Sequence, residues 1–202
     1  MPQLETLRIT FHSPISSRDV VRQLLHMPII VDVTLPNLRW LTLGCINAYL
    51  EAFLLQINAP VLEKVQIIFF DQLTLSVPHL LQFLATAENL RFRCVSLTFS
   101  SGCIFVRMDP RSETGMYALS VHVACKHLDW QVASAAQLFD VLRPVLSSVE
   151  YLYLKYKRSS ISTQWHNEAD RTRWRELLRS FSNAKMLLVD DGLVVGELSR
   201  SL

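Results

Sequence analysis

Glycine is scarce in this chain, which has five glycines among 202 residues, well below the usual share of about 7%. Loops that cradle phosphate groups and turns that expose a catalytic serine depend on glycine, because the backbone there must turn tightly or approach a ligand closely. None of Gly44, Gly102, Gly115, Gly192 and Gly196 lies in such a motif. This scarcity argues against most classes of nucleotide-dependent enzyme.

The chain also lacks a long apolar run and a large charge of one sign. The nearest apolar run, Ile46 to Ile57, is shorter than the roughly 18 residues that a membrane span needs and contains Glu51. The net charge is +2, and the Lys and Arg residues are scattered among Asp and Glu instead of forming a basic cluster. We therefore expect neither a membrane nor a nucleic-acid partner.

Cysteine is sparse and is not arranged for cross-linking or metal binding. The four cysteines, Cys45, Cys94, Cys103 and Cys125, form no C-x-x-C pair. Met1 is followed at once by a strand-like segment, so we expect no secretory signal. These features predict reduced thiols in an intracellular protein, cytoplasmic or nuclear, with no metal and no cofactor.

What the chain has instead is one short sequence motif that recurs, which we call a phrase. Its apolar residues follow the pattern L-x-x-L-x-L, and its copies span residues 2–9, 36–43, 60–67, 147–154 and, more weakly, 182–189. The last apolar–polar–apolar positions fit a short strand, because side chains alternate between faces along a strand. A single copy cannot bury its apolar side, so the copies must stack.

Segments with the apolar spacing of helices separate the phrases. We predict helices at residues 17–27, 48–58, 78–87, 134–146 and 168–181, with Asn47 as the cap of the second and Pro78 at the start of the third. The alternation of strands and helices predicts an α/β fold, an irregular leucine-rich-repeat-like solenoid (horseshoe) with a mainly parallel sheet and convex helices.

The middle of the chain departs from this pattern. Residues 94–99, 103–108 and 116–124 are typical of strands, and 100–102 and 109–115 have the composition of a turn and an exposed loop. We predict an inserted β-hairpin at about residues 100–124, and a polar surface loop at 155–167. Residues 1–202 are interpreted as a single leucine-rich-repeat-like domain. We expect it to be a fragment of a longer array, because neither end carries a visible polar cap.

Three groups of polar residues are weak candidates for chemistry. His122, Cys125 and His127 are residue types that bind zinc, but a structural site needs four converging ligands, so we interpret them as a strand followed by a turn. Asp190 and Asp191 precede a glycine and fit a turn. The acidic and basic residues at 166–179 fit the start of a helix. We predict that the chain is not an enzyme.

The residues between the strand leucines form the candidate binding site. They must face away from the core, and we predict that they line the concave face of the sheet. The candidates are Arg8, Trp40, Thr42, Lys64, Gln66, Ser96, His122, Tyr151, Tyr153 and Lys155. Exposed Trp and Tyr beside Arg and Lys is the composition of protein-interaction hot spots. The alternative is that Trp40 or Tyr151 only packs over a neighbouring strand.

The repeat region resembles that of the fungal F-box/leucine-rich-repeat-like proteins. The resemblance rests on residues 35–41, 48–53, 59–65, 127–132 and 174–185. It implies that the repeats select a protein substrate, while an F-box of about 40–50 residues would dock a ubiquitin ligase through a Skp-type adaptor. Only Met1, Pro2 and Gln3 precede the first phrase, so we expect adaptor binding only if an F-box exists upstream.

We therefore expect a non-catalytic protein-binding repeat domain that forms the substrate-recognition region of an F-box-type ubiquitin-ligase subunit. Two alternatives stay open. One is a free-standing repeat scaffold unrelated to ubiquitination, and the other is an enzyme with no recognisable motif. An enzyme would have a deep polar pocket with titratable groups of shifted pKa, whereas a repeat domain would have a shallow open sheet.

Overall fold

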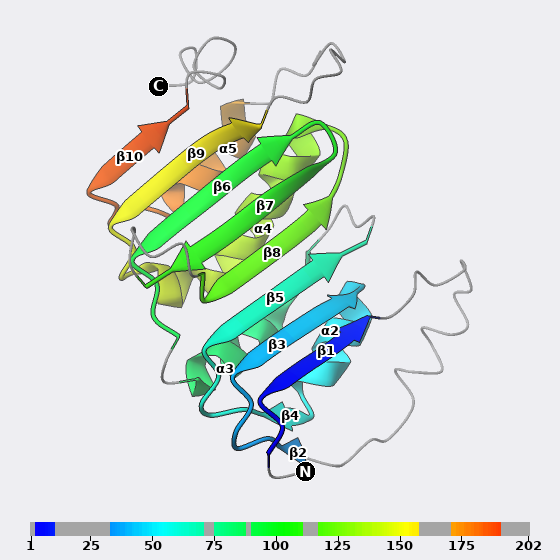
Figure 1. The fold of residues 1–202 in the computed structure, drawn as a ribbon. Coiled ribbons are helices and arrows are strands. Elements are labelled where there is room, and N and C mark those ends of the chain that lie inside the picture. The colour runs from blue at the N-terminus through cyan, green and yellow to red at the C-terminus, as the bar shows by residue number, and fades with distance from the viewer. Residues whose placement is uncertain are drawn as a thin grey trace.

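The computed structural model describes residues 3–10, 33–70, 75–87, 90–110, 117–157 and 171–190. Within these ranges eight strands form one sheet (Figure 1). Their order across the sheet is β1 (Thr6–Thr10), β3 (Trp40–Cys45), β5 (Lys64–Phe69), β8 (Leu119–Ala124), β7 (Cys103–Asp109), β6 (Cys94–Ser100), β9 (Tyr151–Lys157) and β10 (Met186–Val189). Two shorter strands, β2 (Val33–Thr34) and β4 (Ile57–Asn58), pair separately.

Neighbouring strands in the main sheet are parallel except at β7, which runs antiparallel to both β6 and β8. The helices that the structure describes all cover the same face of this sheet (Figure 1). They are α2 (Asn47–Leu54), α3 (Pro78–Thr86), α4 (Leu128–Leu146) and α5 (Arg171–Arg179). The predicted α/β class with a mainly parallel sheet is thus confirmed.

The hydrophobic core fills the space between the sheet and these helices. The apolar side chains of the inner strand phrases are buried in it, as Leu41, Leu43 and Leu154 show, while those of the outer strands β1 and β10 are partly exposed. Trp174 of α5 is also buried and meets Phe99 of β6 edge-on, with ring centroids 5.4 Å apart. The core therefore has the composition that the L-x-L alternation predicts.

All five predicted phrases end in strands of the main sheet, namely β1, β3, β5, β9 and β10. The structure adds a sixth copy, which leads into β6. There Phe92 takes the place of the first leucine, and Val95 and Leu97 follow at the spacing of the other copies. All three side chains are buried. The sequence pattern missed this copy because it begins with an aromatic residue.

The same main-chain junction links successive phrases. The carbonyl of the residue after the first apolar position accepts the N–H groups of two consecutive residues in the next phrase. This carbonyl belongs to Glu5, Arg39, Arg93 and Glu150, with N···O distances of 2.8–3.1 Å. A turn before each phrase recurs as well, because the N–H of its first apolar residue bonds to the carbonyl three residues earlier at Leu38, Leu62, Val149 and Ala184. Because these junctions are equivalent, the strands that they link begin at corresponding residues of their phrases.

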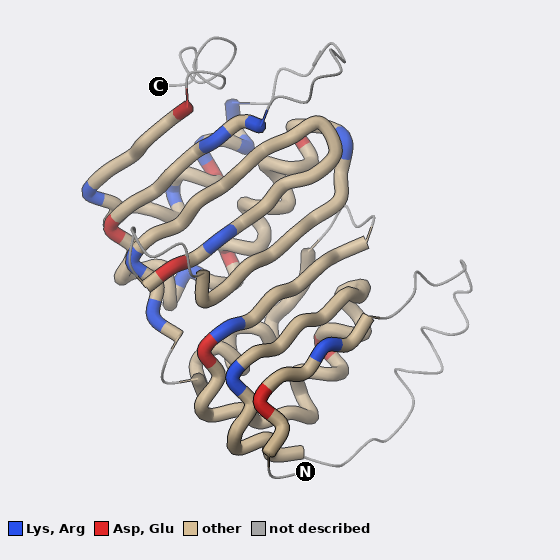
Figure 2. Tube along the Cα trace, viewed as in Figure 1, with Lys and Arg blue, Asp and Glu red and all other residues tan. Residues whose placement is uncertain are grey.

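The side chains at these junctions alternate in charge along the sheet. They are Glu5, Arg39 and Glu63 on one side of the hairpin and Arg93, Glu150 and Lys185 on the other. Figure 2 shows this as red and blue alternating at the edge where the strands begin. Glu150 binds Arg93 at 2.6 Å and Lys185 at 2.9 Å, and the hydrogen bonds from Lys185 and Arg93 lower its pKa. Exposed ion pairs add little stability, so their main effect is to favour unlike neighbours in the stack.

The helix predicted at 48–58 differs in its bounds from α2 (Asn47–Leu54). The helix predicted to end at Asn58 ends at Leu54, because Ile57 and Asn58 pair with Val33 and Thr34 as strands. The residue at its cap position is Ile46 instead of Asn47. No helix in the described part of the chain is long and apolar enough to cross a membrane.

The other predicted helices agree with the structure to different extents. Helix α3 is confirmed within one residue, and α4 begins six residues before the predicted start, at Leu128. Residues 155–157 belong to β9 instead of a loop. The helix predicted at 17–27 lies outside the described residues, as do residues 158–170.

The predicted hairpin forms and is inserted into the stack of phrases. Strands β7 and β8 lie between β5 and β6, so that Val65 pairs with Leu119 where another phrase would otherwise follow. Both ends of the insertion meet at one side chain. The buried Gln131 of α4 donates from Nε2 to the carbonyl of Ser100 at 2.7 Å and to that of Cys125 at 2.9 Å. The chain therefore enters the hairpin after Ser100 and leaves it at Cys125, and both points lie next to Gln131.

Replacing Gln131 with leucine tests this attachment. We expect Gln131→Leu to lower the free energy of unfolding by about 1–3 kcal/mol, because two largely buried carbonyls lose their shared donor. Denaturant unfolding followed by circular dichroism measures the change. The control is Gln82→Leu on the exposed side of α3, expected within about 0.5 kcal/mol of the parent. Equal stabilities for the two variants would contradict the role of Gln131.

Candidate protein-interaction face

We call the side of the main sheet that lies opposite helices α2 to α5 the open face (Figure 1). Side chains reach it from every second residue of each strand, because the intervening residues are buried in the core. All ten predicted binding residues lie on it: Arg8 on β1, Trp40 and Thr42 on β3, Lys64 and Gln66 on β5, Ser96 on β6, His122 on β8, and Tyr151, Tyr153 and Lys155 on β9. The structure therefore brings the predicted site together on one surface.

The strand register arranges these residues in rows across the sheet. One row runs through Arg8, Thr42, Gln66, Ser120, Arg107, Ser96, Tyr153 and Leu188. Sequence reasoning left out Phe105, Arg107 and Asp109 of β7, which lie in the middle of the face. Their signal was present, because they alternate with the buried Ile104, Val106 and Met108.

Trp40 is the most exposed aromatic side chain of this face. Its exposed fraction is 54%, and the ammonium group of Lys64 lies 5.7 Å from its ring centroid. Lys64 also lies 4.3 Å from the ring of Tyr117, over which Arg107 is placed at 5.3 Å. Such cation–π contacts contribute about 0.5–1 kcal/mol at exposed sites. They hold the cations in place and leave much of the indole open to a partner.

A second cation–aromatic group lies on β9, next to an apolar edge. The ammonium group of Lys155 is 5.4 Å from the ring centroid of Tyr153. On the neighbouring strand β10, Met186 and Leu188 are 46% and 44% exposed and pair with Tyr151 and Tyr153. The face therefore combines aromatic, aliphatic and cationic groups.

A hollow of about 210 Å³ opens on this face between the hairpin and β9. Ser96, Arg107, Asp109, Tyr117, Tyr153 and Lys155 line it. Burial raises the pKa of Asp109, while Arg107 and Lys155 oppose the shift. Cys94 also lines the hollow. Burial, assisted by the negative charge of Asp109, raises the pKa of its thiol to about 11, so this thiol stays protonated at neutral pH.

His122 lies beside the hairpin and stacks on Phe105. The ring centroids are 4.5 Å apart and the planes differ by 4°. Burial lowers the pKa of His122, and its Nε2 atom is buried without a hydrogen-bond partner in the described part of the chain. The imidazole is therefore neutral at pH 7 and acts as part of the apolar surface.

The residues considered for zinc binding have other surroundings. His127 packs edge-on against Trp130, with ring centroids 4.4 Å apart, and burial raises the pKa of Cys125 to about 12. Across the described ranges no three His, Cys, Asp or Glu side chains are grouped so that they could hold a metal ion. Asp190 follows β10 and donates its N–H to the carbonyl of Leu154. Residues 166–170 and Asp191 lie outside the described residues.

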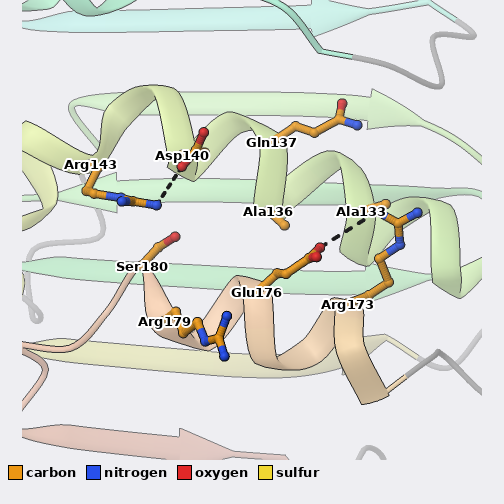
Figure 3. Close-up of a pocket in the computed structure, with 9 residues that line it drawn as sticks. All are labelled: Ala133, Ala136, Gln137, Asp140, Arg143, Arg173, Glu176, Arg179 and Ser180. Atoms are coloured by element: carbon orange, nitrogen blue, oxygen red, sulfur yellow. Dashed lines mark hydrogen bonds and ion pairs between the residues drawn. The ribbon is translucent and has the colours of Figure 1, made fainter.

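A groove of about 280 Å³ lies on the helical side, between α4 and α5 (Figure 3). Its charged side chains pair with one another, since Arg143 contacts Asp140 at 2.6 Å and Arg173 contacts Glu176 at 3.7 Å. These pairs bridge successive turns of one helix each. Arg179 also lines the groove, so three cations stand against two carboxylates, and the groove carries a smaller excess of positive charge than the open face.

Comparisons of the chain with protein-family models, curated proteins and solved structures found no match.

The pH dependence of stability tests the environment of His122. The unfolded chain takes up a proton near the ordinary pKa of 6.5, whereas the folded chain does so only at lower pH. The free energy of unfolding therefore falls as the pH drops below about 6.5. We expect His122→Phe, which keeps the stack on Phe105, to lose less stability between pH 7.5 and pH 5.5 than the parent. The same loss in both chains, measured by urea unfolding, would show that His122 titrates normally when folded.

Proposed function

We propose that this chain is a non-catalytic, protein-binding repeat domain of the leucine-rich-repeat kind and that its open face holds the partner. The observation that carries the proposal is the gathering of the ten predicted residues on the uncovered face, with the exposed Trp40 at one end and Tyr153 beside Lys155 at the other. Aromatic residues flanked by cations are enriched among the residues that dominate binding energy in protein interfaces.

The repeat nature of the domain is supported by the equal main-chain junctions. The phrases of β3, β5, β6 and β9 bury the same three apolar positions, and four junction carbonyls accept paired N–H groups in the same way. A stack of equivalent units gives a broad surface of side chains in regular rows. This is the arrangement by which solenoid proteins bind other proteins, and we infer a horseshoe-type solenoid interrupted by one hairpin.

A macromolecular partner fits this face better than a small substrate. Its hollow of about 210 Å³ is smaller than the ~300–1,000 Å³ of typical small-molecule pockets. The aromatic and cationic groups extend far beyond the hollow, over strands β3 to β9. This distribution favours a macromolecular partner at the open face.

The resemblance to fungal F-box/leucine-rich-repeat-like proteins supports a more specific role. We propose that the domain recognises the substrate of a ubiquitin ligase, inside the cell, and that any Skp-type adaptor binds an F-box upstream. The four cysteines are free thiols, in keeping with a reducing compartment. A reading frame that continues upstream into an F-box would support this role, and a promoter directly before Met1 would favour a free-standing scaffold.

Affinity capture with paired variants tests the binding face. We expect the double variant Trp40→Ala, Tyr153→Ala to lose captured proteins, because truncating a hot-spot aromatic costs about 2 kcal/mol or more in binding. Native cells supply the proteins, and quantitative mass spectrometry compares variant and parent, with Skp-type and cullin subunits as the diagnostic hits for ligase membership. The matched control is Trp130→Ala, an exposed tryptophan on α4. Equal capture by the double variant and the parent would contradict a site on the open face.

A further inference from the structure

The open face carries an excess of positive charge that the whole chain does not. The described side chains on this face include five cations, Arg8, Lys64, Arg107, Lys155 and Lys157, against two carboxylates, Asp109 and Asp190. Figure 2 shows the positively charged positions spread over both halves of the sheet. The complete chain has a net charge of only +2. Charge complementarity therefore favours a negatively charged partner.

The hollow on the open face indicates a second chemical property of the partner, besides its negative charge. Asp109 lines the hollow together with Arg107 and Lys155. Burial raises its pKa, while these two cations oppose the shift. Its Oδ1 atom is buried and has no hydrogen-bond partner among the described residues. A buried acceptor of this kind costs free energy unless a donor reaches it. A ligand that fills the hollow should thus offer a hydrogen-bond donor to Asp109 and a negative charge to its two neighbours.

We propose that the open face binds an acidic peptide segment, with one Asp or Glu residue of that segment seated at the hollow. The carboxylate of this residue lies between Arg107 and Lys155, and a main-chain N–H of the segment donates to Asp109. Every acidic residue in a peptide carries both groups within a few ångströms, so a single residue meets both requirements. The aromatic rings of Trp40, Tyr117 and Tyr153 supply apolar contact on either side. This inference rests on the proposed protein-binding function and names its partner's chemistry.

A nucleic acid is the other polyanion that a basic sheet with aromatic residues could hold. Phosphate groups are acceptors without donors, so a phosphate seated at the hollow would meet the carboxylate of Asp109 with repulsion instead of a hydrogen bond. A peptide has main-chain N–H groups that can donate to Asp109, so we expect the acidic peptide to bind the hollow more tightly than a nucleic acid. Single-stranded RNA therefore enters the experiment as a competitor.

Selection from a random peptide library tests the proposal even though the natural partner is unidentified. The full chain is immobilised and used to enrich a displayed library of random dodecapeptides. The affinities of the enriched peptides are then measured by fluorescence anisotropy, next to a 12-nucleotide single-stranded RNA. We expect the enriched peptides to be acidic, to bind more tightly than the RNA, and to lose about tenfold or more in affinity with Arg107→Gln, Lys155→Gln. The control Arg143→Gln, Arg173→Gln removes the same charge from the helical side and should leave the affinity within about twofold of the parent value.

Asp109→Leu separates the role of the acceptor from that of charge. It removes the acceptor together with the negative charge, so general attraction of anions would tighten binding of both the peptides and the RNA. If Asp109 accepts a hydrogen bond from the peptide, the peptides bind more weakly to this variant while the RNA binds more tightly.

The outcomes distinguish this inference from the proposed function. Enriched peptides that are neutral or basic, or tighter binding of the RNA, would overturn the acidic-peptide proposal. If these peptides still depend on Trp40 and Tyr153, the open face remains a protein-binding site. A library that yields no enriched peptide, or peptides insensitive to every open-face substitution, would contradict both.

Discussion

One main-chain carbonyl per phrase, accepting two N–H groups from the next phrase, sets the architecture of this protein. Because the junction repeats at Glu5, Arg39, Arg93 and Glu150, strands β1, β3 and β5 begin level with one another, and so do β6, β9 and β10. This register places the paired apolar residues on the core side of the sheet, where they are buried in β3, β5, β6 and β9 and partly exposed in the outer strands β1 and β10. It also places every intervening residue on the open face, so the hydrogen bonds that build the stack also assemble the candidate binding surface.

The hairpin modifies this surface without breaking the stack. Its ends meet at Gln131, so the repeat continues beneath it through α4 into β9. On the open face it adds Arg107 and Asp109 beside Ser96 and Tyr153 of the repeats. In the proposed protein-binding function, the hollow formed by this insertion helps to select the partner, while the stacked phrases provide the broad surface.

Local patterns predicted much of this fold, and long-range pairing limited the rest. The L-x-L alternation located the strand phrases, because a strand that is buried on one side has an apolar residue at every second position. The end of α2 was wrong because Ile57 pairs with Val33, a contact that no local signal reports. The place of the hairpin between β5 and β6 depends on the pairing of Val65 with Leu119. Asp109 was missed because the composition of residues 109–115 indicated an exposed loop, whereas Asp109 is the last residue of β7.

Fluorine NMR on 5-fluorotryptophan-labelled protein tests the central claim most directly. Trp40 reports on the open face, Trp130 on the exposed side of α4, and the buried Trp174 on the core, while Trp165→Phe removes the fourth signal. As a binding protein is added, the account predicts that the Trp40 resonance shifts or broadens and that the other two stay in place. A shift of Trp130 with an unchanged Trp40 would contradict it, because the partner would then lie on the helices.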